Sequence, residues 1–105
     1  MKTMLDKRLE LHNKLVEILG SNHVYFQPPE SITMTYPCIV YERHDINNIH
    51  ADDDAYLQPL QYKITVIDRD PDSTIVEKVS KLKKTRFINH FVSSNLNHDI
   101  FEIYY

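Results

Sequence analysis

The chain is 105 residues long, which is enough for one hydrophobic core and too short for two. Its 12 basic and 15 acidic side chains give a net charge of −3 with neutral histidines, and 42% of its residues are hydrophobic. These values exclude a collagenous, low-complexity or strongly disordered chain. No stretch approaches the ~18 apolar residues of a membrane-spanning helix, and charges appear too early for a secretory signal.

Two rare residue types narrow the function further. Gly20 is the only glycine, so the sequence holds neither a phosphate-cradling loop nor a dinucleotide fingerprint, both of which need several glycines. Cys38 is the only cysteine, which excludes an internal disulfide framework and suits a reducing compartment.

The first predicted element is an amphipathic helix over residues 4 to 19. Its apolar stripe follows Leu5, Leu9, Val16 and Leu19, and it is widened by Met4, Leu11, Leu15 and Ile18. Thr3 is placed to cap the helix, with Asp6 at the capping-box position. Gly20 stands where a left-handed residue ends a helix.

Three strands are predicted next. Residues 23–27 form a short extended piece that Pro28 and Pro29 end. Residues 36–44 are apolar on both faces, which indicates a central strand or one covered on both sides. Residues 45–54 are a polar break, and residues 60–66 alternate apolar and polar side chains as a half-buried strand does.

A second helix and two strands complete the chain. Asp70 fits the N-cap of this helix and Pro71 its first turn, and the helix runs to a lysine-rich end at Lys84. Residues 86–92 predict a strand, 93–99 a turn and 100–105 a last strand. The order α-β-β-β-α-β-β predicts a single α+β domain over residues 1–105, a mostly antiparallel sheet with both helices on one face.

No catalytic constellation emerges from the residues, so we expect no enzyme and no cofactor. Cys38 lies in an apolar strand, where burial should raise the pKa of its thiol. A metal clasp within one loop was weighed against a polar loop facing water, and the polar loop is preferred; the four residues concerned are His44, Asp45, His50 and Asp52.

The basic cluster Lys81, Lys83, Lys84 and Arg86 has two interpretations. It could contact phosphate, but nucleic-acid modules usually carry a basic surplus that this chain lacks. Lysines near the negative end of a helix dipole explain the cluster better.

Three stretches resemble small virion proteins of long-tailed bacteriophages, and most closely the tail terminator (tail-completion or tail-to-head joining) family. They are residues 36–43 (YPCIVYER), 62–72 (YKITVIDRDPD) and 95–101 (NLNHDIF), followed by Tyr104 and Tyr105. The resemblance implies a ring, usually a hexamer, assembled in the host cytoplasm on the head-proximal end of the tail tube. Such a ring stops tube polymerisation, joins the major tail tube protein to the head connector and lets DNA pass through its lumen without specific binding. It implies no catalysis and no membrane partner.

The loop between the second and third strands has a possible place in such a ring. It is long, acidic and free of glycine. We expect Asp52, Asp53 and Asp54 to face the lumen, where like charge keeps DNA from binding. Ile46, Ile49 and Tyr56 are the candidate contacts with the adjacent protomer. The alternatives are a solvated arm, another neck component such as a head-closure protein or connector adaptor, and a small nucleic-acid-binding regulatory module.

Overall fold

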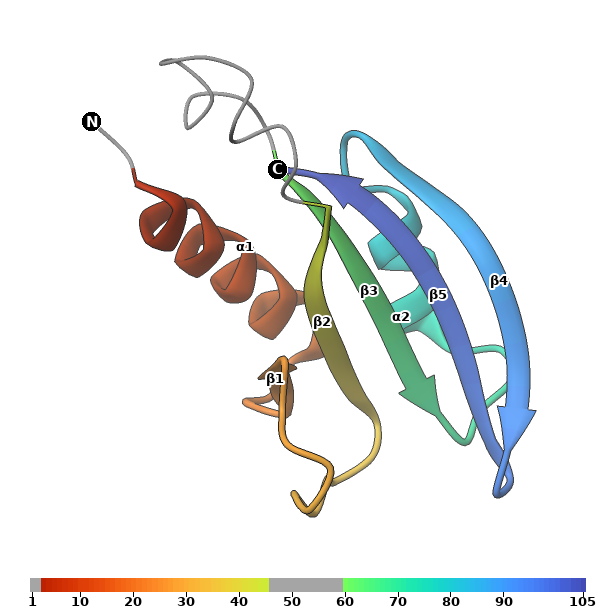
Figure 1. Cartoon of the computed structure of the whole chain (residues 1–105). Helices are drawn as coiled ribbons and strands as arrows, with labels where there is room; N and C mark the ends of the chain where they lie inside the picture. The colour runs from red at the N-terminus through yellow and green to blue at the C-terminus, as the bar shows by residue number, and fades with distance from the viewer. Residues whose placement is uncertain (1–2, 46–59) are drawn as a thin grey trace.

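The computed structural model describes residues 3–45 and 60–105 and confirms the α+β architecture (Figure 1). The elements are α1 (Met4–Leu19), β1 (Val24–Phe26), β2 (Cys38–Asp45), β3 (Gln61–Asp68), α2 (Thr74–Ser80), β4 (Thr85–Ser93) and β5 (Leu96–Tyr104). The five strands form one sheet in the order β1-β2-β3-β5-β4. Only β1 and β2 run parallel, and the other three pairs are antiparallel.

Helix α1 begins and ends as its sequence predicts. The Thr3 hydroxyl accepts from the Asp6 amide at 3.1 Å, and the Asp6 carboxylate accepts from the Thr3 amide at 3.1 Å. Gly20 follows the helix with φ of 80°, a conformation that costs glycine little. The capping box and the left-handed end are therefore both confirmed.

The buried stripe of α1 is narrower than predicted. Leu11 and Leu15 are fully buried, whereas Leu5 and Leu9 are 53% and 43% exposed. A helix lying on a sheet buries only the part of its circumference that faces the strands. The expectation that Leu5 and Leu9 belong to the core stripe is wrong for this reason.

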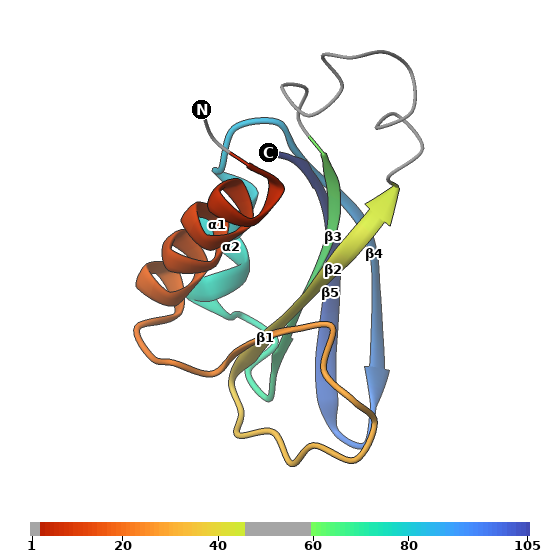
Figure 2. The ribbon, with the colours of Figure 1, turned by 60° about the vertical axis from the view of Figure 1, so that its left-hand side comes forward.

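Both helices cover the same face of the sheet, and the core lies between the helices and this face (Figure 2). Alternate residues of three neighbouring strands point into this core, as the period of a strand requires. These are Ile39 and Tyr41 of β2, Tyr62, Ile64 and Val66 of β3, and Phe101 and Ile103 of β5.

β2 lies between β1 and β3, as predicted for a central strand, and its first residue is also covered on both faces. Cys38 pairs with Ile67 of β3, and both are buried although they point away from the helices. The connection between β1 and β2 passes over this end of the sheet (Figure 2), and the Met34 sulfur lies 4.0 Å from the Cys38 sulfur.

The start of α2 differs from the prediction. Ser73, not Asp70, is the N-cap, and its hydroxyl accepts from the Ile75 amide at 3.2 Å. The carboxylates of Asp68 and Asp70 instead accept from amides two residues further on, at 3.1 and 2.9 Å. Asp side chains stabilise such turns as readily as helix starts, so the pattern alone did not distinguish the two. The helix also ends early, at Ser80, and leaves the lysine-rich residues in a connection.

The predicted turn over residues 93–99 is mostly strand. β5 begins at Leu96, and the turn is only Ser94 and Asn95, with φ of 53° and 64°. Two consecutive residues with positive φ make the tight hairpin turn whose twist matches antiparallel strands. The polar residues that follow, Asn97, His98 and Asp99, belong to the hairpin, where side chains remain near water.

Candidate functional site

β4 is a nine-residue edge strand that carries large apolar side chains in the open. Phe87, Ile88, Phe91 and Val92 are 52%, 42%, 43% and 61% exposed, and we call these four residues the β4 surface. Within the described residues β4 pairs with β5 alone, so its outer backbone groups have no ladder partner. A long apolar edge strand of this kind invites pairing with another chain.

The β4 surface continues onto both faces of the β4–β5 hairpin. Phe87 contacts Phe101 edge to face, with ring centroids 5.5 Å apart, on the side of the helices. Phe91 stacks on His98, with centroids 4.5 Å apart, on the opposite side. An irregularity in register between Phe87 and Asn89 precedes this change of side. A partner that covers the whole β4 surface therefore contacts both faces of the hairpin.

Ionisable side chains of the β4–β5 hairpin lie in pairs. The His90 ring nitrogen lies 2.8 Å from the Asp99 carboxylate, and an Arg86 nitrogen lies 2.8 Å from Glu102. This pairing satisfies the ionisable groups within the hairpin, whereas the apolar side chains of the β4 surface remain exposed.

A second, smaller apolar surface lies on α1 and consists of Leu5 and Leu9. The neighbouring side chains on one side, Arg8 and His12, reach the Tyr41 hydroxyl of β2 at 3.1 and 2.8 Å. At ~100° per residue, Leu5 and Leu9 follow Arg8 and His12 around the helix, on the flank away from α2. α1 packs on β1 and β2, so this α1 surface and the β4 surface lie at opposite edges of the sheet (Figure 1).

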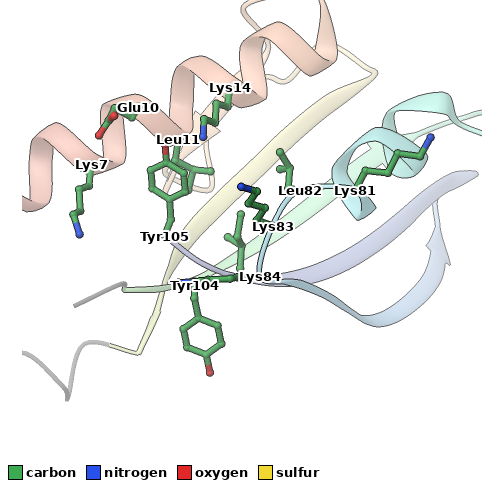
Figure 3. A pocket seen from close by; sticks show the side chains of 11 residues that line it. Lys7, Glu10, Leu11, Lys14, Lys81, Leu82, Lys83, Lys84, Tyr104 and Tyr105 are labelled. Carbon is green, nitrogen blue, oxygen red and sulfur yellow. The ribbon is translucent and has the colours of Figure 1, made fainter. Parts of the chain in front are cut away.

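A groove of about 540 Å³ opens between α1, the connection after α2, and the end of β5. Five lysines line it, Lys7 and Lys14 from α1 and Lys81, Lys83 and Lys84 from the connection, and we call it the lysine groove (Figure 3). Three lysines of the basic cluster predicted from the sequence therefore line the same groove as Lys7 and Lys14, which lie some seventy residues earlier in the chain.

Under α1 lies a buried polar cluster centred on the Tyr41 hydroxyl. Arg8 donates to this oxygen at 3.1 Å, and the Nδ1 atom of His12 lies within hydrogen-bond distance of it at 2.8 Å. Burial raises the pKa of Tyr41, and burial together with the Arg8 charge lowers the pKa of His12. Burial and the Arg8 charge therefore both favour the neutral form of His12 beside the Tyr41 hydroxyl.

The sequence-predicted site residues fall in two groups. The interface candidates Ile46, Ile49 and Tyr56, and the lumen candidates Asp52, Asp53 and Asp54, lie outside the described residues, as does His50, so that His50 and Asp52 of the four metal-clasp residues are outside them. The His44 ring lies 3.7 Å from the Glu102 carboxylate. Among residues 3–45 and 60–105 no group of three His, Cys, Asp or Glu side chains is placed to hold a metal.

The predicted burial of Cys38 and the predicted rise in its pKa are confirmed. Its side chain is fully buried, and burial raises the pKa of the thiol from 9.0 to about 11. Neither described helix has the length and hydropathy to cross a bilayer.

The β4 surface and the α1 surface were missed at the sequence level. For the β4 surface, the sequence does contain a signal: two pairs of adjacent apolar residues, Phe87-Ile88 and Phe91-Val92, lie inside one strand. Adjacent residues of a strand point to opposite faces, and the helices cover only one face, so some of these four had to remain exposed.

No family model, no curated protein and no solved structure matches this chain.

Proposed function

We propose that this chain is a structural protein of the tail terminator kind, which forms a ring on the head-proximal end of a phage tail tube, ends tube polymerisation and joins the tail to the head connector. The observation that carries the proposal is the position of the β4 surface and the α1 surface at opposite edges of one sheet.

Opposite edges favour a head-to-tail contact between copies. Two different surfaces of one chain pair with their counterparts on two neighbours, and such contacts close into a ring when the rotation per copy divides a full turn. Exposed apolar side chains gathered on an edge strand are costly in water unless a partner covers them. If the β4 surface of one copy packs on the α1 surface of the next, the contact is head-to-tail and the apolar side chains of both surfaces are covered.

The finer features of the proposal come from the resemblance. They are a hexamer, contact with the major tail tube protein and the head-closure or connector protein, and a lumen that DNA traverses. Asp52, Asp53 and Asp54 remain the proposed lumen residues, and Ile46, Ile49 and Tyr56 remain proposed contacts between protomers. The same surfaces would serve another neck component, which gene order and imaging of the neck would distinguish.

Tail length tests the function. In the phage that carries this chain, replacing Phe91 and Val92 together with Ser should leave a folded protein and produce overlong tubes without heads. Tyr104→Ser is the matched control, because Tyr104 is 46% exposed on β5 and lies outside both surfaces. Normal tails and attached heads in the Phe91/Val92 variant would refute the proposed role of β4.

Disulfide trapping tests the head-to-tail contact directly. A chain carrying Leu9→Cys and Val92→Cys should form a ladder of linked oligomers in isolated tails under oxidising conditions, ending at the closed ring. The two sites lie at opposite edges, so they cannot link within one copy, and Cys38 is too buried to interfere. Glu17→Cys with Val92→Cys is the control, since Glu17 is exposed on α1 outside the α1 surface. An equal ladder in the control, or none in the test variant, would contradict this geometry.

A further inference from the structure

We propose that the lysine groove binds an acidic segment of a partner protein, one in which carboxylates flank a large apolar side chain. This binding is separate from ring formation, because the groove shares no residue with the β4 surface or the α1 surface.

The floor of the groove is apolar. Leu11 and Ile103 are core residues, while Leu82 and Tyr105 are partly buried and pack against the core from the groove side. In Figure 3 the Leu11, Leu82 and Tyr105 side chains lie around the centre of the groove, whereas Tyr104 points away from it. A volume of about 540 Å³ is within the range of pockets that enclose an organic ligand or a few side chains.

The rim of the groove carries lysines on two opposite walls and one carboxylate, Glu10, on the α1 wall. Lys14 lies over the Tyr105 ring, with its nitrogen 4.8 Å from the ring centroid, and Lys83 reaches the same opening from the other wall (Figure 3). Lys14, Lys83 and Lys84 are exposed and make no ion pair with the described residues. Lys81 differs, because it pairs with Glu77 at 3.4 Å and points away from the floor.

This combination favours a carboxylate-bearing peptide over a nucleic acid. The phosphate backbone of a duplex offers no apolar group to cover Leu82 and the Tyr105 ring. Surfaces that bind nucleic acid usually carry a basic surplus over the domain, whereas this chain has a net charge of −3 and its lysines gather in one short groove. A short peptide can place one apolar side chain on the floor and its carboxylates against lysines on both walls.

The test uses the full chain and a fluorescein-labelled, aspartate-rich peptide with a central Leu-Phe pair, followed by fluorescence anisotropy. The peptide should bind at low salt and weaken as salt rises. Lys14→Glu combined with Lys83→Glu should weaken binding by about tenfold or more, since both walls then repel the carboxylates.

Two controls make the result specific. Arg69→Glu combined with Lys78→Glu changes the net charge equally at exposed positions that do not line the groove. Compared at ~0.15 M salt, where distant charges are screened, this variant should keep the affinity within about twofold of the unchanged chain. An aspartate-rich peptide without the Leu-Phe pair should bind more weakly than the probe, because it leaves the floor empty.

Three outcomes would overturn the proposal. The first is no binding of the probe peptide by a chain that circular dichroism shows to be folded. The second is equal loss of binding in the two charge-reversal variants. The third is a short DNA duplex binding more tightly than the peptide with the same dependence on Lys14 and Lys83, which would make the groove a nucleic-acid surface.

Discussion

Replacing Tyr41 with Phe isolates the contribution of the polar cluster beneath α1. The Tyr41 ring is fully buried, and it packs on Phe26 and Tyr62 with ring centroids 5.0 and 6.1 Å away. Phe preserves this packing and removes only the hydroxyl, which bonds Arg8 at 3.1 Å and His12 at 2.8 Å. The substitution therefore measures two hydrogen bonds that tie α1 to β2.

The expected loss of stability follows from those two bonds. A hydrogen bond within a protein contributes a net ~1 kcal/mol, and somewhat more when one partner is charged. Arg8 is only partly buried, so water replaces part of its lost bond. Together the two bonds predict a decrease of about 1–2 kcal/mol in the free energy of unfolding, which is roughly a 0.5–1 M lower urea midpoint for a domain of this size.

Tyr62→Phe is the matched control for this experiment. Its ring is equally buried, but its hydroxyl lies near Arg43 without a hydrogen bond of good geometry to a described residue. Removing that hydroxyl should change stability by less than about 0.5 kcal/mol, because little bonding is lost. Urea unfolding at neutral pH measures both variants. Equal stability of Tyr41→Phe and the unchanged chain, or equal losses in both variants, would refute the assignment.

Four further outcomes follow from the structure. The pKa of His12 is lowered by burial and by Arg8, so the unfolded chain binds this proton first; stability should fall as pH drops below about 6.5, and less steeply in His12→Gln, as urea midpoints at several pH values will show. Gly20→Ala should lower the free energy of unfolding by about 1 kcal/mol, because alanine is strained at a φ of 80°. The new methyl group meets no atom within 4 Å, so no steric clash adds to this loss, and an unchanged thermal melt would contradict the prediction. Ser73→Ala removes the α2 N-cap and should cost ~1 kcal/mol in the same melts. With a pKa of about 11, roughly one Cys38 thiol in a thousand is ionised at pH 8; alkylation should therefore be slow in the folded chain and fast in urea.

The strand order explains why the β4 surface lies at an edge of the sheet. β5 enters the sheet between β3 and β4, so the penultimate strand of the chain becomes an edge. Along that edge Arg86 is the one cation, whereas edge strands that avoid pairing usually carry several charges. This edge is suited to a partner strand or helix.

Local features were predictable because the groups that produce them are close in sequence. The Thr3–Asp6 capping box and the left-handed Gly20 depend on residues within a few positions, and both formed as expected. The alternation of residues 60–66 predicted which side of β3 is buried, because the two faces of a strand differ by one residue.

Other local patterns admitted two structures, and tertiary contacts chose between them. Asp70 and Ser73 are both good N-caps, and Ser73 was selected where Ile75 and Val79 of α2 meet the core. Residues 96–99 look like a turn by polarity, yet Asn97, His98 and Asp99 pair with both β3 and β4, and Leu96 pairs with β4. Pairing with distant strands outweighed their low strand propensity.

By itself, the sequence determined the class of the domain, its element order and the chemistry of its ends and core, because these rest on periodicity and on neighbours along the chain. Only the tertiary structure decided which strands lie at the edges of the sheet and that Leu5 and Leu9 face outward. It also decided that lysines from α1 and from the connection after α2 share one groove. Strand order and helix placement bring together residues far apart in sequence, and no local pattern encodes which of those residues will meet.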